Sequence, residues 1–153
     1  MLNKLSKKLL AVGIIVFSLV FSSQAAFAAN VPDQEYNDDY YSAQKLVYGD
    51  LAVGKINSAN DRDWFYVETG ANDGGREMTL FLQTKPESSH SIFVINKNFG
   101  EPVPYTVLSQ GVGNPEWVSF RVEANARYNF IVFKSSLTGY DPNATYYLNP
   151  WLF

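Results

Sequence analysis

The sequences Trp117-Val-Ser-Phe-Arg-Val122 and Arg127-Tyr-Asn-Phe-Ile-Val-Phe-Lys134 carry the pattern that decides the fold. Large apolar side chains recur at every second position in both, as in a strand with one face in a core. The side chains predicted to point inward are Val118, Phe120 and Val122 in the first strand, and Tyr128, Phe130 and Val132 in the second. This leaves Ile131 and Phe133 on the outer face, which is unusual for a surface.

Similar runs, rich in aromatic and β-branched residues and separated by Gly, Pro and Asn, extend over the rest of the chain. The predicted strands are Leu51–Ile56, Asp63–Glu68, Glu77–Gln83, Ser91–Asn96, Tyr105–Leu108, Trp117–Val122, Arg127–Lys134 and Thr145–Leu152. Only Asp39–Val47 could be helical. The pattern predicts an all-β fold, an antiparallel, jelly-roll-like β-sandwich of about eight strands. Pro150 cannot donate to a ladder, so we expect an edge or a bulge there.

Residues 1–28 have the features of a signal peptide. Basic residues come first, an apolar run from Leu9 to Phe21 follows, and Ala26-Phe-Ala28 fits the specificity of signal peptidase. The alternative, an uncleaved membrane anchor, is disfavoured because the apolar run is shorter than the roughly 20 residues that cross a bilayer. We expect cleavage after Ala28, a single domain over residues 29–153, and a secreted, extracellular protein that is not held at a membrane.

The charge and the cysteine count exclude several classes of protein. The net charge is −3, and loss of the leader lysines makes the chain more acidic, so nucleic acid is not an expected partner. The chain has no cysteine, so disulfides cannot stabilise the exported fold. A bound metal ion could take over part of that role.

Several short motifs occur in a characteristic order. They are Glu35-Tyr-Asn37-Asp38, Gly54-Lys-Ile56, Asp61-Arg-Asp63-Trp64-Phe65, Tyr128-Asn-Phe130-Ile-Val132 and Tyr146-Tyr-Leu148. In this order and spacing they resemble the bacterial pre-peptidase C-terminal (PPC) domain, a small β-sandwich often appended to secreted proteases. The chain is similar to the collagen-binding domains of secreted collagenases, and the resemblance covers nearly all of the mature chain.

The resemblance implies a calcium site between two oxygen-rich clusters. Carried over by position, the ligands would be Asp33, Glu35, Asn37, Asp38, Asn60 and Asp63. Carboxylate and amide oxygens suit calcium, and nitrogen or sulfur ligands for zinc or copper are lacking. The chain departs from the family at Tyr36, where Pro is frequent, and at Asn60, where an acid is frequent. The second change would weaken affinity. The alternative is a solvated acidic linker and an ordinary Asn/Asp turn.

The sequence gives little support for an enzyme. A Ser–His–acid set would need His90, which is the one histidine of the chain and lies in a polar Ser-rich stretch. Composition alone leaves a paired-carboxylate glycosidase open. We nevertheless expect a non-catalytic protein, because a cation explains the clustered acids better.

Aromatic side chains on the surface provide the remaining functional signal, because they suit binding of polysaccharide or extended peptide. The candidates are Tyr36, Tyr40, Tyr41 and Tyr48 near the start, Ile131 and Phe133 on an outer face, and Tyr147, Trp151 and Phe153 near the end. The predicted ligand-binding surface consists of four of them, Ile131, Phe133, Tyr147 and Trp151. Alternatively, many of them pack in a small cluster under the amino-terminal segment. Some members of the family bind collagen through tyrosines where this chain has Phe133 and Ser135, which argues against collagen.

Two functions are therefore predicted. The first is a secreted, calcium-stabilised, non-catalytic binding module for an extracellular polysaccharide or protein surface. The second is a free-standing regulator, inhibitor or stabiliser of a secreted protease, because the family is usually found beside such enzymes.

Overall fold

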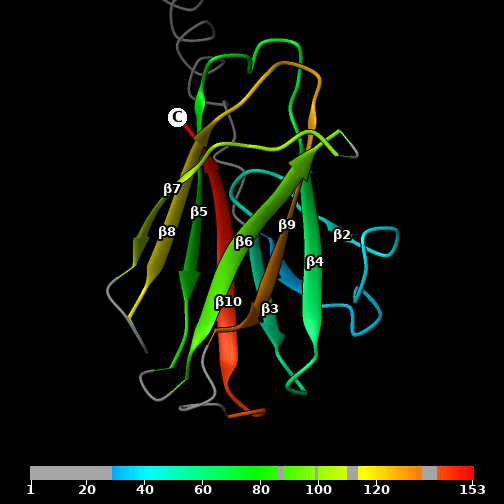
Figure 1. Cartoon of the computed structure of the whole chain (residues 1–153), viewed down its shortest axis with the longest axis vertical. Helices are drawn as coiled ribbons and strands as arrows, with labels where there is room; N and C mark the ends of the chain where they lie inside the picture. The colour runs from blue at the N-terminus through cyan, green and yellow to red at the C-terminus, as the bar shows by residue number, and fades with distance from the viewer. Residues whose placement is uncertain (1–28, 86–87, 99, 110–113, 136–140) are drawn as a thin grey trace, which may run out of the picture.

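The chain forms a β-sandwich of two sheets (Figure 1). The computed structural model describes residues 29–85, 88–98, 100–109, 114–135 and 141–153. The predicted signal peptide lies outside the described residues. The strands are Asn30–Pro32 (β1), Gln44–Lys45 (β2), Leu51–Lys55 (β3), Arg62–Glu68 (β4), Glu77–Gln83 (β5), His90–Lys97 (β6), Thr106–Ser109 (β7), Glu116–Arg121 (β8), Arg127–Lys134 (β9) and Thr145–Leu152 (β10).

Six strands form one sheet, in the order β1-β3-β10-β5-β8-β7, and four form the other, in the order β2-β4-β9-β6. The apolar side chains that face each other across the two sheets form one core. The side chains that alternation predicted to point inward on β8 and β9 all belong to this core, and so do Met78, Leu80 and Leu82 of β5. The all-β sandwich predicted from the sequence is confirmed.

The predicted strands agree closely with the observed ones. The bounds of β5, β9 and β10 are as predicted, and the other five predicted strands differ by one residue at one or both ends. Two strands were not predicted, β1 and β2, and both pair in parallel with a neighbour, β1 with β3 and β2 with β4. The sheets are therefore mixed and not purely antiparallel.

The prediction of a helix over Asp39–Val47 is wrong. Asp39 Oδ1 accepts hydrogen bonds from the backbone N–H groups of Tyr41 and Ser42 at 2.8 and 2.9 Å. An Asp side chain that binds the backbone in this way favours a turn over a helix. The segment therefore turns and then enters β2.

The expectation of an edge or a bulge at Pro150 holds only locally: β10 lies between β3 and β5 in the sheet, but at Pro150 its one ladder partner is β5. The carbonyl of Pro150 accepts a hydrogen bond from Gly49 N at 2.8 Å, on the β3 side. In a strand, the N and the C=O of one residue point to the same side, so the Pro150 nitrogen also faces away from β5. The register with β3 has already ended at Leu148, so no ladder bond with β3 is lost.

Candidate functional site

The amino-terminal segment is tied to both sheets by backbone hydrogen bonds. Asp33 N donates to Val53 O of β3 at 3.0 Å, and Trp64 N of β4 donates to Asn37 O at 2.8 Å. Asn37 also donates through Nδ2 to Asp33 Oδ1 at 2.8 Å. These bonds bring the first oxygen-rich cluster of the sequence against the second one.

Asp63 lies at the centre of this junction, with 2% of its surface exposed. The hydroxyl of Tyr146, on β10 of the other sheet, donates to Asp63 Oδ2 at 2.6 Å. Gly54 makes this approach possible, because a Cβ there would clash with the Tyr146 hydroxyl and lie 2.8 Å from Asp33 Cβ. The Gly of the Gly54-Lys-Ile56 motif is thus required by close packing at the acidic cluster.

Burial and mutual repulsion make these carboxylates hard to ionise. Burial raises the pKa of Asp63 to about 9, and the charge of Asp33 adds to the shift. Burial raises the pKa of Asp33 to about 6, a shift that Glu35 increases and the hydrogen bond from Asn37 opposes. Without a cation, the pair therefore retains a proton at neutral pH.

Asn37 Oδ1 is buried and has no hydrogen-bond partner, and Asp33 Oδ2 has none apart from the proton that Asp33 can share with the adjacent Asp63 carboxyl. Asn37 is only 1% exposed, so bulk water does not reach its side chain to donate a hydrogen bond. Buried acceptors without a donor are costly, and carboxylate and amide oxygens are the ligands that a hard cation such as calcium takes. The residues at this junction therefore fit a calcium ion.

The other predicted ligands lie further out. Glu35, Asp38 and Asn60 line a hollow of about 410 Å³ together with Asn57, Ser58 and Asp61. A second hollow of about 290 Å³ is lined by Asp33, Glu35, Gly54 and Asn57, among others, so Glu35 borders both. The six predicted residues thus belong to one region but lie in an inner and an outer group.

The residues Asn57, Asp61 and Tyr146 make contacts in this region and were not nominated as ligands from the sequence. Asn57 donates through Nδ2 to Glu35 Oε2 and through its backbone N to Asp61 Oδ2. Burial raises the pKa of Asp38, and the hydrogen bond and the charge of Asp61 add to the shift. Asp61 could have been found from its place in the Asn60–Asp63 cluster, whereas Tyr146 is brought there only by the fold.

Among the described residues, no three His, Cys, Asp or Glu side chains converge on a point where they could hold a metal ion by themselves. A calcium site here would therefore draw on amide and backbone carbonyl oxygens as well as carboxylates, which calcium accepts readily. Asn37, Asn57 and Asn60 supply such amides.

The outer face of the six-stranded sheet carries a second candidate site, an aromatic cleft of about 650 Å³. The cleft is lined by Leu51, Phe81, Trp117, Asn149, Trp151 and Phe153. The rings of Phe81 and Trp117 are in contact, with centroids 4.2 Å apart. Trp117, Trp151 and Phe153 are all exposed, so the rings present carbon surface to solvent.

The structure divides the four residues of the predicted ligand-binding surface between two faces. Trp151 lines the aromatic cleft, and Tyr147 lies on the same face of β10. Ile131 and Phe133 lie on the outer face of the four-stranded sheet, opposite Trp64 and Arg62 of β4. The four residues therefore do not form one surface. Trp117 was not nominated, although alternation along its strand already directs it outward.

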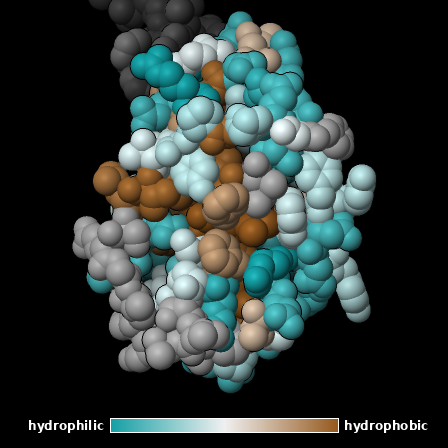
Figure 2. All heavy atoms as spheres, viewed as in Figure 1, coloured by the Kyte–Doolittle hydropathy of each residue, from teal (hydrophilic) through white to brown (hydrophobic). Residues whose placement is uncertain are grey.

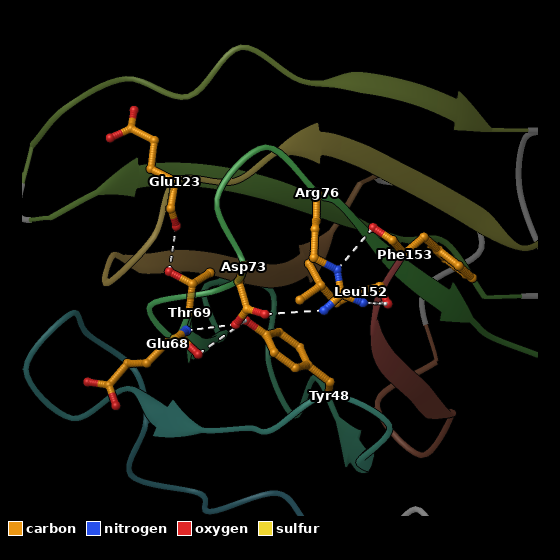
Figure 3. A network of polar contacts seen from close by, with 9 residues as sticks. Tyr48, Glu68, Thr69, Asp73, Arg76, Glu123, Leu152 and Phe153 are labelled. Atoms are coloured by element: carbon orange, nitrogen blue, oxygen red, sulfur yellow. Dashed lines mark hydrogen bonds and ion pairs between the residues drawn. The ribbon is translucent and has the colours of Figure 1, made fainter.

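A network of polar contacts holds the end of β10 and Phe153, which lines the aromatic cleft (Figure 3). Arg76 donates through Nε to Phe153 O at 3.3 Å and through Nη2 to Leu152 O at 3.0 Å. Its third contact is an ion pair with Asp73 at 3.2 Å, and Asp73 also accepts from the Tyr48 hydroxyl. These bonds hold the end of β10 against the loop before β5.

His90 is buried between the sheets, and neither ring nitrogen has a hydrogen-bond partner. Its ring lies beside that of Tyr146, with centroids 5.9 Å apart. The neighbouring Ser91 hydroxyl donates instead to the carboxylate of Glu116 at 2.8 Å. Within the described part of the chain, His90 is therefore not paired with a serine.

No described segment forms a helix long and apolar enough to cross a membrane.

Comparison with known proteins confirms the fold. No protein-family model matches the sequence, and no curated protein is significantly similar to it. A similar solved structure is the pre-peptidase C-terminal domain of collagenase from Bacillus anthracis, at 15% sequence identity and a TM-score of 0.52. The match covers 79% of this chain and 98% of that domain. The chain therefore has the fold of a PPC domain, as its sequence motifs predict.

Proposed function

We propose that this protein is a secreted, non-catalytic binding module that attaches to an extracellular polymer or protein surface. The observation that carries the proposal is the aromatic cleft on the six-stranded sheet, lined by Phe81, Trp117, Trp151 and Phe153. Aromatic anchors with few rotatable bonds give a large contact area at a low cost in conformational entropy. Solvent-exposed rings held on regular strands are already placed for a ligand.

The binding test is retention on insoluble bacterial cell wall, chitin, cellulose and collagen. We expect retention on at least one of them, and its loss in a double variant with Trp117→Ala and Trp151→Ala. Both side chains are partly exposed, so truncation leaves the core intact. The matched control is Tyr41→Ala, an exposed aromatic residue outside the cleft that should leave retention unchanged. No retention on any material, or equal retention of the double variant, would remove the cleft from the proposal.

A calcium ion at the acidic junction forms the second part of the proposal. Asp33, Asn37 and Asp63 would form its inner side, and Glu35, Asp38 and Asn60 its outer side. The support comes from the buried acceptors without partners and from the raised pKa values of the carboxylates. The ion would take the place of the retained proton and fasten the amino-terminal segment to both sheets.

Calcium titration by calorimetry tests this part. We expect binding with release of protons, visible as a dependence of the heat on the ionisation enthalpy of the buffer. Calcium at one hundred times its dissociation constant should stabilise the fold by about 2.7 kcal/mol, and a chelator should reverse the rise in melting temperature. Asp63→Asn should abolish the response, whereas the exposed Glu77→Gln should keep it. An identical melting curve in calcium and in chelator would contradict the site.

Export is the third part, and rests on the leader of residues 1–28. Amino-terminal sequencing of protein from the culture medium should begin at Ala29. The second function predicted from the sequence, regulation of a secreted protease, remains a separate hypothesis. A mixing assay with proteases secreted by the same organism would test it.

A further inference from the structure

The aromatic cleft continues into a second hollow on the outer face of the six-stranded sheet. This second hollow has a volume of about 590 Å³, and its lining includes Glu77, Thr106, Ser119 and Arg121. Trp117 of the cleft alternates along β8 with Ser119 and Arg121 of the second hollow, so the three side chains point to the same face. The cleft and the second hollow therefore lie side by side along β8.

An apolar row crosses the strands of this face. Phe81 of β5 is paired with Trp117 of β8, and Trp117 is paired with Leu108 of β7. Leu108 is 67% exposed and borders the second hollow. Figure 2 shows hydrophobic surface at the left edge of the molecule, where Figure 1 places β7. The row therefore carries apolar surface from the cleft to the second hollow.

A row of hydroxyl groups lies beside the apolar row. Ser119 of β8 is paired with Thr79 of β5 and with Thr106 of β7. The hydroxyls of Thr79 and Ser119 form a hydrogen bond of 2.9 Å, which uses only one of their two O–H donors. Thr106 is exposed. Because a hydroxyl both donates and accepts, this row suits a ligand that carries hydroxyls itself.

The next row along the strands is charged. Glu77 and Arg121 are direct cross-strand partners, and both are exposed. None of the ion pairs found among the described residues includes either of them. A carboxylate accepts hydrogen bonds and a guanidinium donates them. The two charges are opposite, so this row favours an uncharged ligand with both donors and acceptors.

We infer that the cleft and the second hollow together bind an uncharged polysaccharide. The inference rests on the proposed function, because it names the class of ligand for the same cleft. A pyranose ring has an apolar C–H face and hydroxyl groups around its rim, which match the apolar row and the polar rows beside it. The sugar rings stack on Trp117 and Trp151, and their hydroxyl groups bond to Ser119, Glu77 and Arg121.

The charge of the protein and the position of the site favour this ligand over other polymers. The net charge is −3 even with the lysines of the leader included, so anionic polymers are repelled. An extended peptide gains much of its affinity by adding a strand to a free sheet edge. β5 and β8 are paired on both sides, so a peptide on this face would lack those backbone hydrogen bonds.

Calorimetric titration with cellohexaose, xylohexaose and chitohexaose tests the inference, with a collagen-model peptide as the alternative ligand. We expect binding of at least one hexasaccharide, with the same affinity at low and at high salt because the ligand is uncharged. Arg121→Ala and Glu77→Ala should each raise the dissociation constant by about tenfold or more, because hydrogen bonds to a charged group are lost. The matched control is Lys45→Ala, which removes an exposed charge on β2 of the other sheet and should leave the constant unchanged.

Three outcomes would overturn the inference: no binding of any hexasaccharide, binding that both Arg121→Ala and Glu77→Ala leave unchanged, or an affinity that falls steeply with salt. Circular dichroism checks that the variants are folded, which the exposure of both side chains favours. Retention on collagen that depends on Trp117 and Trp151, without binding of a hexasaccharide, would keep the proposed function and remove only the polysaccharide. Absence of retention on every material and of hexasaccharide binding would remove both.

Discussion

Replacing Tyr146 by Phe removes one oxygen atom from the junction between the two sheets and leaves the ring in place. The lost hydroxyl lies on β10 and donates to Asp63 Oδ2 on β4 at 2.6 Å. Because the ring remains, no cavity forms, and the hydrogen bond is the main interaction that changes. The variant therefore measures how strongly the acidic cluster joins the sheets.

The size of the effect follows from the burial of both partners. Removing the donor leaves a buried oxygen of Asp63 without a partner where water does not replace it, which costs about 1 to 3 kcal/mol. For a domain of this size, 1 kcal/mol corresponds to about 4 °C in melting temperature. We therefore expect Tyr146→Phe to lower the melting temperature by about 4 to 12 °C.

The assay is thermal unfolding followed by circular dichroism, in calcium and in chelator. The control is Tyr147→Phe, one residue further along β10, where the side chain is exposed on the outer face. Its hydroxyl can bind water, so the control should melt within about 1 °C of the wild type. Equal melting temperatures for the two variants would show that the bond between Tyr146 and Asp63 contributes nothing, and would refute the reasoning.

Three further predictions concern packing and pH. Gly54→Ala should lower the free energy of unfolding by about 1 to 3 kcal/mol in denaturant titrations, because the new methyl group would clash with the rigid Tyr146 ring. The control, Gly70→Ala, has only the flexible carboxylate of Asp73 nearby and should lower the free energy of unfolding by less. A larger loss in Gly70→Ala than in Gly54→Ala would contradict the close contact at Gly54. Burial lowers the pKa of His90, so the unfolded chain takes up a proton more readily than the folded one, and stability falls as the pH drops through 6.5. His90→Phe should therefore lose less stability than the wild type between about pH 7 and about pH 5. An equal loss in the two proteins, measured as the free energy of unfolding against pH, would exclude His90 as the cause. Glu116→Ala should lower the free energy of unfolding by about 1 to 3 kcal/mol in denaturant titrations, because the Ser91 hydroxyl and the buried Ile92 N–H of β6 lose their acceptor. An unchanged denaturation midpoint would argue against this contact between the sheets.

The strands were predictable because their signal is local. Alternation along β5, β8 and β9 assigns each side chain to a face, and burial of one face in a sandwich fixes the same assignment in three dimensions. β1 and β2 have too few residues for a periodic pattern, and their pairing depends on partners distant in sequence. The expectation of an edge or a bulge at Pro150 did not reveal that β10 is a central strand, because a proline shows only its own missing N–H and not the strands on either side. The Pro150 nitrogen faces the turn at Gly49, and the sequence does not show that this turn lies beside β10.

The candidate sites were predictable to a smaller extent. The acidic residues of the junction were found because they form two dense clusters in the sequence. Tyr146 is distant from both clusters, and no spacing rule connects it with Asp63. The predicted aromatic surface failed as a single surface because alternation gives the face of one strand but not the sheet to which the strand belongs. Tyr147 and Ile131 therefore seemed equivalent, although they lie on different sheets.

The central position of β10 has a consequence for the order in which the molecule is completed during synthesis. β10 separates β3 from β5, so the larger sheet cannot close until residues 145–152 have been synthesised. Until then, β3 and β5 lack the strand with which each of them pairs in the native sheet, and the core lacks Tyr146 and Leu148. Closure of the larger sheet is therefore a late step, taken after all four strands of the smaller sheet have been synthesised.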